Sequence, residues 1–358
     1  MASTIRSLQV RAGQQRYEVL IGGGLLGEAG ARIRPILSAA RCAVIADANV
    51  APLFGQKVSQ SLGGAGFEVE TIVVDGGEAA KSMAKAAELC QRLSELRLDR
   101  RSFLLTLGGG VIGDLAGFVA AIYLRGIPYV SLPTTLLAQV DSCIGGKTGV
   151  NLSAGKNLIG AFHQPSLVLA DTDTLQTLPE RIWNEGFAEA IKHGIIRDSE
   201  LFYSLGEVDR GDPAAFIARN IALKAGIVEA DERERNDTRS LLNFGHTIGH
   251  AIEHAAGYGN ILHGEAISLG ILAAAHISVR RAGLSLGEVE KIRATLERHH
   301  LPARLPPDFP RQKIFEALPR DKKFEGGRIR FVVAHAIGRA SVCKEVTMPD
   351  LEAAIALL

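Results

Sequence analysis

The first half of the chain alternates short apolar, β-branched runs with segments in which apolar residues recur at helical spacing. The runs predict strands at 42–46, 68–74, 102–107, 129–132 and 167–170. Between the second and third runs, Ser82 precedes apolar residues at 86, 89, 93 and 96, which predicts an N-capped helix. Strands that alternate with helices favour a parallel sheet covered on both faces. Residues 8–11 and 17–21 flank Gly13 and predict a β-hairpin at one edge.

After Asp171 the pattern changes to one dominated by helical spacing. We predict helices at 181–193, 213–229, 241–254, 265–281 and 287–299, with a lone strand at 328–333. The sequence therefore predicts an α/β domain over 1–171 and a mainly α-helical domain over 172–358. No repeat or low-complexity linker separates them, and the cleft between two such domains is the usual place for a ligand.

Composition supports two globular domains and excludes several classes of function. The chain has 358 residues, of which 47% are hydrophobic and 22% charged. With 40 basic and 39 acidic residues, the net charge of +1 gives no reason to expect nucleic acid or a membrane surface as partner. The first residues lack the apolar core of a signal peptide, and no apolar stretch is long enough to span a bilayer. Four widely spaced cysteines form no C-x-x-C pair, which fits a reducing, cytoplasmic location.

A glycine-rich loop indicates nucleotide binding. The run Gly108-Gly109-Gly110-Val-Ile-Gly113 follows a predicted strand and opens a predicted helix. In that context, glycines let backbone N–H groups approach a pyrophosphate at the positive end of the helix, although glycines also mark plain turns. The acidic residue expected about 20 positions later for the ribose is missing, because Pro133-Thr134-Thr135 stands there. Asp47, which ends an earlier strand, is an alternative. We predict a Rossmann-like fold that departs from the Rossmann pattern.

The segment 141–157, DSCIGGKTGVNLSAGKN, is polar and rich in glycine. Its polar side chains include Asp141, Lys147, Asn151, Lys156 and Asn157. Both lysines follow a glycine, so exposed backbone amides stand beside an ammonium group, as in anion-binding loops. A Walker A loop is excluded because no glycine stands at 141. An oxyanion cradle and a solvated surface loop both remain open.

Histidines and carboxylates in the second half indicate a metal site. His246, His250 and His254 lie at i, i+4 and i+8 of a predicted helix, and His263 precedes Glu265 by two residues. Imidazole with carboxylate suits zinc, but the HExxH signature of metalloproteases is absent. Spacing alone nominates His246 and His250 as a ligand pair and leaves open whether His250 is a ligand or an acid–base group. Glu189 with Lys192, at i and i+3, is either a third ligand position or a surface ion pair.

Four long motifs resemble those of 3-dehydroquinate synthases. They are LPTTLLAQVDSCIGGKTGVNLSAGKNLIGAFHQP, TLPERIWNEGFAEAIKHGII, LLNFGHTIGHAIE and LHGEA, and the resemblance extends from about Asp47 to Lys323. It implies a nucleotide-binding α/β domain, a helical domain, an active site between them, and a homodimer. Related cyclases that make valiolone-type or deoxy-inosose rings differ in the run Gly145-Gly146-Lys147-Thr148-Gly149, which is intact here.

The resemblance also implies ligands for each residue set. Zn²⁺ or Co²⁺ would be held by Glu189, His246 and His263, which replaces the pairing suggested by spacing. NAD would contact Asp47, Asn49, Glu78, Lys81, Gly109, Gly110, Asp114, Thr134, Thr135 and Thr177, with Lys156 either at the NAD or ordering its loop. The substrate would contact Asp141, Lys147, Asn157, Lys192, Lys224, Arg239, Asn243, His250 and either Lys322 or Lys323, with Arg125 reaching the phosphate site of the neighbouring subunit.

The implied reaction converts 3-deoxy-D-arabino-heptulosonate 7-phosphate into 3-dehydroquinate and phosphate, the second step of the shikimate pathway. Oxidation by NAD, phosphate elimination, reduction, ring opening and aldol closure would occur at one site. Lys147, Asn157 and Arg125 would hold the phosphate, Arg239 and Lys224 the carboxylate, and His250 would shuttle protons. The competing interpretations are a metal- and NAD-dependent dehydrogenase of the glycerol dehydrogenase type, a sister cyclase, and a non-catalytic nucleotide-binding protein.

Overall fold

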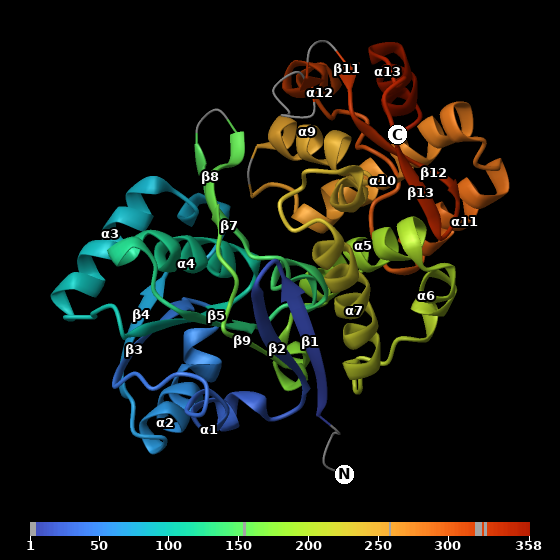
Figure 1. Ribbon diagram of the computed structural model, residues 1–358. Coiled ribbons are helices and arrows are strands. Elements are labelled where there is room, and N and C mark those ends of the chain that lie inside the picture. The colour runs from blue at the N-terminus through green and yellow to red at the C-terminus, as the bar shows by residue number, and fades with distance from the viewer. Residues whose placement is uncertain (1–4, 153–154, 258, 319–323, 326–327) are drawn as a thin grey trace. The chain divides into compact units, whose positions relative to one another are not determined.

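The computed structural model describes residues 5–152, 155–257, 259–318, 324–325 and 328–358 (Figure 1). The chain forms two compact units, one of residues 1–178 with 209–229 and the other of residues 179–208 with 230–358. This arrangement differs from a single division after Asp171, because the segment 209–229 returns to the first unit. None of the helices in the described part of the chain has the length and apolar character that crossing a bilayer requires.

The first unit is built on a seven-stranded sheet with the order β1-β2-β9-β6-β5-β3-β4. Its strands are β1 (Arg6–Ala12), β2 (Gln15–Gly22), β3 (Arg41–Asp47), β4 (Glu68–Val74), β5 (Phe103–Gly108), β6 (Tyr129–Pro133) and β9 (Leu167–Asp171). All neighbours are parallel except the edge hairpin β1–β2. The predicted parallel sheet, its strands and the edge hairpin are therefore confirmed.

Both faces of this sheet are covered by helices, which explains why its strands are apolar throughout. The helices of the unit are α1 (Ala29–Ile33), α2 (Gln56–Gly64), α3 (Met83–Glu95), α4 (Gly110–Ile122) and α7 (Ala214–Ala230). Along β5, Phe103 and Leu105 join the core that includes Ile33 and Leu62 of α1 and α2, while Leu104 joins the core that includes α3 and α4. As predicted, α3 is capped by Ser82, whose hydroxyl accepts from the Lys85 N–H.

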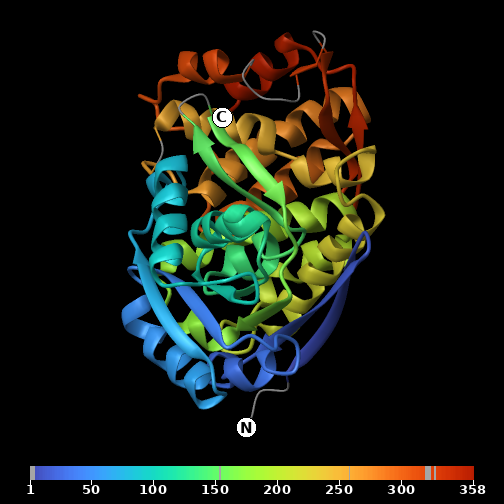
Figure 2. The same cartoon turned by 60° about the vertical axis from the view of Figure 1, so that its left-hand side comes forward.

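The segment from Asp141 to Asn157 is not a simple loop. After a short helical turn, η5 (Ala138–Ser142), the chain forms an antiparallel hairpin of β7 (Lys147–Leu152) and β8 (Gly155–Phe162). The hairpin packs against α4, and Figure 2 shows it in green beside that helix. Period-two alternation is weak here because the burial pattern of β8 mixes exposed and half-buried residues.

The second unit is mainly helical, as predicted. Its helices are α5 (Glu180–Arg197), α6 (Ser199–Ser204), α8 (Asp237–Ser240), α9 (His246–Ala256), α10 (His263–Ala282), α11 (Leu286–Arg298), α12 (Arg311–Ala317) and α13 (Met348–Ala356). The helix predicted over 241–254 begins later, at His246, because Gly245 adopts φ 80° and separates it from a 3₁₀ turn at Leu241–Asn243.

The prediction of a single lone strand at 328–333 is wrong. A short β11 (Arg328–Ile329) pairs with β10 (Phe324–Glu325), and the longer β12 (Phe331–Ala336) pairs with β13 (Arg339–Cys343) in a separate hairpin. The turn at Gly338, with φ 94°, supplies the hairpin signal that the prediction overlooked. All four cysteines are free thiols, and Cys42 and Cys143 are buried.

Candidate active site

The residues expected to contact NAD line the carboxyl edge of the parallel sheet in the first unit. They follow β3 (Asp47, Asn49), β4 (Glu78, Lys81), β5 (Gly109, Gly110, Asp114), β6 (Thr134, Thr135) and β9 (Thr177). Open α/β sheets bind ligands outside the carboxyl ends of their strands, so this edge is the physically expected place for a nucleotide. Five separate chain segments thus bring ten predicted residues to one edge.

Side chains of neighbouring segments lie close to the glycine loop after β5, and they can do so because the glycines have no side chains. A Cβ on Gly109 would lie 3.1 Å from Cγ2 of Thr135, and one on Gly108 would lie 3.2 Å from Cβ of Asp47. A Cβ on Gly110 would lie 3.2 Å from Oγ of Ser142. Because α4 starts at Gly110, the N–H groups of its first turn lack partners within the helix. The loop can therefore bring backbone donors close to an anionic group.

A buried lysine stands beside this loop. Lys81 is 4% exposed, and its Nζ lies 2.7 Å from Oδ2 of Asp114 and 3.7 Å from Oε1 of Glu78. Nζ of Lys156, from the hairpin, lies 3.3 Å from the same Glu78 oxygen. Asn157 joins the group, because its Oδ1 accepts from Lys81 at 2.7 Å. Two cations and two carboxylates balance in charge, which favours an ionic cluster that is partly withdrawn from solvent.

The other substrate residues of the first unit lie in three places. Asp141 pairs with Lys224 of α7, whose Nζ lies 2.7 Å from Oδ2 and donates to the backbone oxygen at 2.6 Å. Lys147 is the first residue of β7 and is exposed. Arg125 is exposed just beyond α4, in a run of left-handed residues that includes Leu124 and Gly126.

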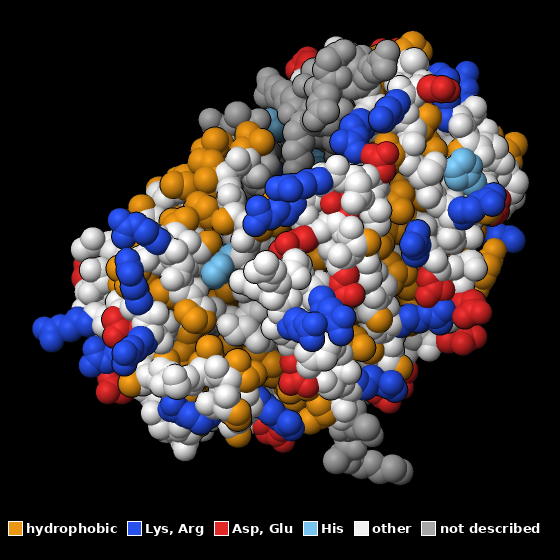
Figure 3. Space-filling view, viewed as in Figure 1, with side chains coloured by type: hydrophobic (Ala, Val, Ile, Leu, Met, Phe, Trp, Pro, Cys, Tyr) orange, Lys and Arg blue, Asp and Glu red, His pale blue; other side chains and the backbone are white. Residues whose placement is uncertain are grey.

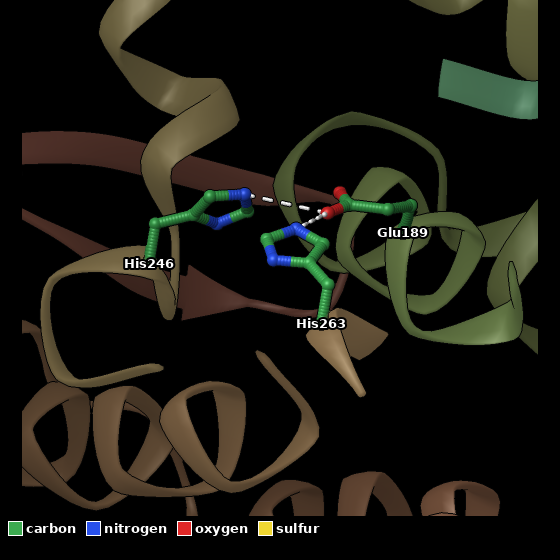
Figure 4. A group of neighbouring side chains, drawn as sticks. All are labelled: Glu189, His246 and His263. Carbon is green, nitrogen blue, oxygen red and sulfur yellow. Dashed lines mark hydrogen bonds and ion pairs between the residues drawn. The ribbon is translucent and has the colours of Figure 1, made fainter. Parts of the chain in front are cut away.

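In the second unit, Glu189, His246 and His263 come together (Figure 4). They come from the middle of α5 and from the first residues of α9 and α10. Nε2 of each histidine lies 3.3 Å from the same Glu189 oxygen, Oε1. The three ligand atoms fall within 4.8 Å of one another. Two imidazole nitrogens and one carboxylate oxygen are a donor set that suits Zn²⁺ or Co²⁺.

Glycines set the distances between these helices. A Cβ on Gly270 of α10 would lie 2.0 Å from the backbone oxygen of Gly245, which directly precedes His246. A Cβ on Gly264, next to His263, would lie 2.2 Å from the backbone oxygen of Glu185 on α5. Backbone therefore touches backbone on both sides of α10, and no larger residue would allow these helix ends to approach so closely.

Each group of the metal centre has a second partner that orients it. Nδ1 of His246 contacts the Phe244 carbonyl at 3.1 Å, and Nδ1 of His263 lies 3.5 Å from Oε2 of Glu253. The other oxygen of Glu189 forms an ion pair with Lys192, and both side chains are 2% exposed. The interpretation of Glu189 and Lys192 as a surface pair is therefore wrong. Partners of this kind fix the tautomer of a ligand histidine and the orientation of its ring.

Burial and charge shift the pKa values at this centre. Burial opposes ionisation of Glu189, but Lys192 and His246 outweigh it and hold its pKa well below the usual range. Burial also disfavours charged His263, yet hydrogen bonds to Glu189 and Glu253 raise its pKa to about 10. For His246, burial dominates and lowers the pKa. A carboxylate that stays ionised suits a metal ligand, whereas His263 must lose a proton when it binds a cation.

Three more residues of the second unit are predicted to contact the substrate: His250, Arg239 and Asn243. The ring of His250 lies 5.3 Å from that of His246 and 5.9 Å from that of His263, between centroids, so it borders the centre. Arg239 is 2% exposed and donates to the Glu232 carbonyl, while the Asn243 amide donates to Glu234 at 2.9 Å. Lys322 and Lys323 lie outside the described residues.

Two further carboxylates at the metal centre, Glu185 and Glu253, are not among the residues predicted from the sequence. Glu253 is 3% exposed, and Glu185 accepts from the Gly264 N–H at 3.4 Å. Burial raises the pKa of Glu185 to about 7, against the opposing effects of His263 and the Gly264 N–H. For Glu253, the available signal was an acidic residue directly after the apolar pair Ala251-Ile252, since acidic residues are rare on buried helix faces unless they are paired.

Solved structures with the same fold define the class. A 2-epi-5-epi-valiolone synthase from Streptomyces hygroscopicus subsp. jinggangensis, with NAD⁺ and Zn²⁺ bound, superposes with a TM-score of 0.87 at 30% identity, covering 97% of each chain. A 2-deoxy-scyllo-inosose synthase complexed with carbaglucose-6-phosphate, NAD⁺ and Co²⁺ gives 0.89 at 26% identity, covering 98% of this chain and 99% of that one. The chain therefore has the fold of the sugar phosphate cyclases.

Family models and relatives narrow this class. The model described as 3-dehydroquinate synthase N-terminal matches residues 71–185, and the one described as 3-dehydroquinate synthase C-terminal matches residues 186–324. The 3-dehydroquinate synthase of Symbiobacterium thermophilum is 47% identical over 94% of this chain and 96% of its own length. That of Thermodesulfovibrio yellowstonii is 44% identical over 97% and 99%. The chain belongs to the 3-dehydroquinate synthase family.

Proposed function

We propose that this chain converts 3-deoxy-D-arabino-heptulosonate 7-phosphate into 3-dehydroquinate and phosphate, with NAD and Zn²⁺ or Co²⁺ as cofactors. The observation that supports this most directly is that Glu189, His246 and His263 bring three metal-ligand atoms together in a member of this family. The second unit supplies the metal ligands, and the sheet edge of the first unit supplies the nucleotide contacts. Both are needed for a reaction that combines hydride transfer with Lewis-acid chemistry.

The metal would be held by His246 Nε2, His263 Nε2 and the Oε1 oxygen of Glu189. When bound, the divalent ion lowers the pKa of a substrate hydroxyl by Lewis-acid polarisation. Lys192 keeps Glu189 ionised through the second carboxylate oxygen, and Phe244 and Glu253 hold the outer ring nitrogens. Among the described residues these three are the candidate ligands, so a bound ion would have a position left for substrate or water.

The nucleotide would lie along the sheet edge, with its pyrophosphate at the first turn of α4. When bound there, NAD would supply reversible hydride transfer without being consumed. Gly109 and Gly110 admit the pyrophosphate, and Asp47 is placed at the end of β3, where ribose hydroxyls are expected. Lys81 and Lys156 place ammonium groups at the same edge, each beside a carboxylate.

The substrate roles assigned by the resemblance fit the chemistry of the side chains. Lys147 and Asn157 would hold the phosphate as charge builds on it, and Lys224 and Arg239 the carboxylate. Asp141 fixes the Lys224 ammonium group by a 2.7 Å ion pair. His250 borders the metal ligands and would transfer protons. Lys192, Asn243 and either Lys322 or Lys323 complete the proposed contacts.

We also propose that the chain forms a homodimer through the first unit. Several large apolar side chains there are exposed by about two-fifths or more: Ile122, Leu124, Leu152, Leu158 and Phe162. They belong to the end of α4 and to the hairpin that packs on it, where Figure 3 shows hydrophobic side chains gathered. Exposed Arg125 lies in the same segment, so a partner at this surface would receive its guanidinium group.

Mixed variants test that dimer. If Arg125 completes the partner's site, Arg125→Ala and Lys147→Ala chains are each inactive, but a mixed dimer has one intact site. Random mixing should then restore about one quarter of the wild-type activity. No recovery in a mixture shown to contain the mixed dimer would contradict the role given to Arg125.

Four free thiols support a reducing, cytoplasmic location for the protein.

The proposed reaction is tested by phosphate release from 3-deoxy-D-arabino-heptulosonate 7-phosphate, with and without NAD and before and after chelation. We expect release that needs both NAD and a divalent metal and leaves no net NADH. Net NADH from a polyol without phosphate release would instead favour a dehydrogenase. Metal and NAD binding without either product would favour a sister cyclase that acts on another sugar phosphate.

A further inference from the structure

The hairpin β7–β8 contains an irregularity at the residues proposed to contact NAD and phosphate. Its strands pair regularly from Lys147↔Phe162 to Val150↔Ile159, and the next pair is Leu152↔Gly155. One residue of β7, Asn151, therefore faces three residues of β8: Lys156, Asn157 and Leu158. Asn157 has φ 53°, a left-handed conformation that is uncommon for a residue with a side chain. Such bulges re-aim side chains and leave backbone groups without their ladder partners.

Asn151 supplies the partner that the ladder does not. Its side-chain oxygen accepts from the Asn157 N–H at 2.9 Å. Its own backbone N–H donates at 2.8 Å to the Lys81 carbonyl, and a parallel bridge joins it to Ser82. Its side-chain nitrogen donates to Oε1 of Glu78 at 2.8 Å. One asparagine thus connects the bulge to the segment that follows β4.

This connection places the side chains of Lys156 and Asn157 beside Glu78 and Lys81, in the segment that follows β4. Lys156 Nζ lies 3.3 Å from the Glu78 oxygen that also accepts from Asn151. Asn157 Oδ1 accepts from Lys81, which is itself held by Asp114 at 2.7 Å. Both ends of the Asn151 carboxamide are therefore engaged by protein groups. This residue acts through its neighbours and is a positioning residue.

We propose that Asn151 positions Lys156 and Asn157 for the reaction, by holding the bulge in its left-handed form and fixing it to Glu78. The inference rests on the proposed function, because the proposed function assigns Glu78, Lys81 and Lys156 to NAD and Asn157 to the phosphate. Asn151 would then couple the cofactor contacts of the first unit to its phosphate contact. Its loss should affect both NAD affinity and turnover.

The test compares Asn151→Ala and Asn151→Asp with wild type. The alanine variant loses the acceptor for the Asn157 N–H and the donor to Glu78. We expect NAD affinity to fall roughly tenfold, by calorimetry on the metal-loaded protein, and kcat to fall as well. The aspartate variant keeps the acceptor but places a carboxylate against Glu78. We expect it to retain most of kcat at saturating NAD while NAD affinity falls as in the alanine variant.

A matched control is Gln91→Ala, which removes a carboxamide that donates to Glu95 at 3.3 Å on the exposed face of α3. It should match wild type in NAD affinity, kcat and melting temperature. If Asn151→Ala lowers only the melting temperature and keeps wild-type NAD affinity and kcat below it, Asn151 is merely structural and the inference is overturned. If wild type binds no NAD, the proposed function fails, and the inference fails with it.

Discussion

The nucleotide edge of the first unit and the metal centre of the second unit are built on different principles. The edge collects residues from five strand ends, and their positions follow from the order of parallel strands. The metal centre collects single side chains from three helices whose backbones touch at Gly245, Gly264 and Gly270. One site therefore depends on sheet topology, and the other on close helix packing. The metal centre should be the more sensitive of the two to an added methyl group.

The largest effect that separates the two regions is expected for Lys147→Ala. The side chain is exposed, so stability should change little. If Lys147 stabilises charge on the departing phosphate, turnover should fall about 100- to 1000-fold. Metal content, measured by mass spectrometry, and NAD affinity should stay at wild-type values.

Lys57→Ala, which removes an exposed lysine of the same unit, is the control and should be fully active. The phosphate assignment is incorrect if Lys147→Ala loses NAD affinity while kcat at saturating NAD is preserved. The two regions would then not be separable in the way described.

A smaller effect is expected for Gly270→Ala, which tests the sensitivity of the metal centre. The new Cβ would lie 2.0 Å from the Gly245 oxygen, and the adjacent His246 would have to move. Overpacking of this kind costs about 1–3 kcal/mol, so the melting temperature and the resistance of the metal to chelators should both fall.

Gly226→Ala on α7 is the matched helix substitution, because its Cβ would meet no atom within 4 Å. It should stabilise the protein by about 0.4–1 kcal/mol through the unfolded chain. Equal metal retention in the two alanine variants would show that close glycine packing does not determine the metal centre.

The smallest effect lies outside both regions. Asp350 accepts from the N–H and hydroxyl of Thr347 at 2.9 and 2.8 Å and from Arg281 Nε at 2.9 Å. Burial opposes ionisation, but these partners outweigh it and lower the pKa of Asp350. Its stabilising contribution is therefore complete above the ordinary carboxyl value of about 4 and is lost as the pH falls through the lower folded value.

Asp350→Asn should thus lower the free energy of unfolding by about 1 kcal/mol near neutral pH, and the difference should shrink below about pH 4. Denaturant unfolding at several pH values measures it, with exposed Asp212→Asn as control. A difference that stays constant down to pH 3 would rule out the ionised carboxylate as its source.

The sequence predicted the nucleotide edge well because its signals are local. Each buried strand, the Ser82 cap and the glycine loop lie within a few consecutive residues, and parallel topology then brings their ends together. The bulge at Asn157 could not be predicted in this way. It depends on Asn151 and on Glu78, which are separated from each other by 73 residues.

The metal centre shows where sequence spacing fails. His246 and His250 have the helical spacing of a ligand pair, yet the structure brings Glu189 together with His246 and His263. His263 is 74 residues away from Glu189 in the sequence. Only the resemblance to a family suggested that set. The roles of Gly264, Gly270 and Glu253 depend on packing between helices, and local patterns carry no record of such contacts.

The assignment of the metal ligands is tested by the metal content of His246→Ala and His250→Ala, measured alongside phosphate release. We expect His246→Ala to lose metal and activity together, whereas His250→Ala should keep its metal and lose turnover. If His250→Ala also loses its metal while His263→Ala retains it, the ligands are the pair suggested by helical spacing, and the metal centre described here is wrong.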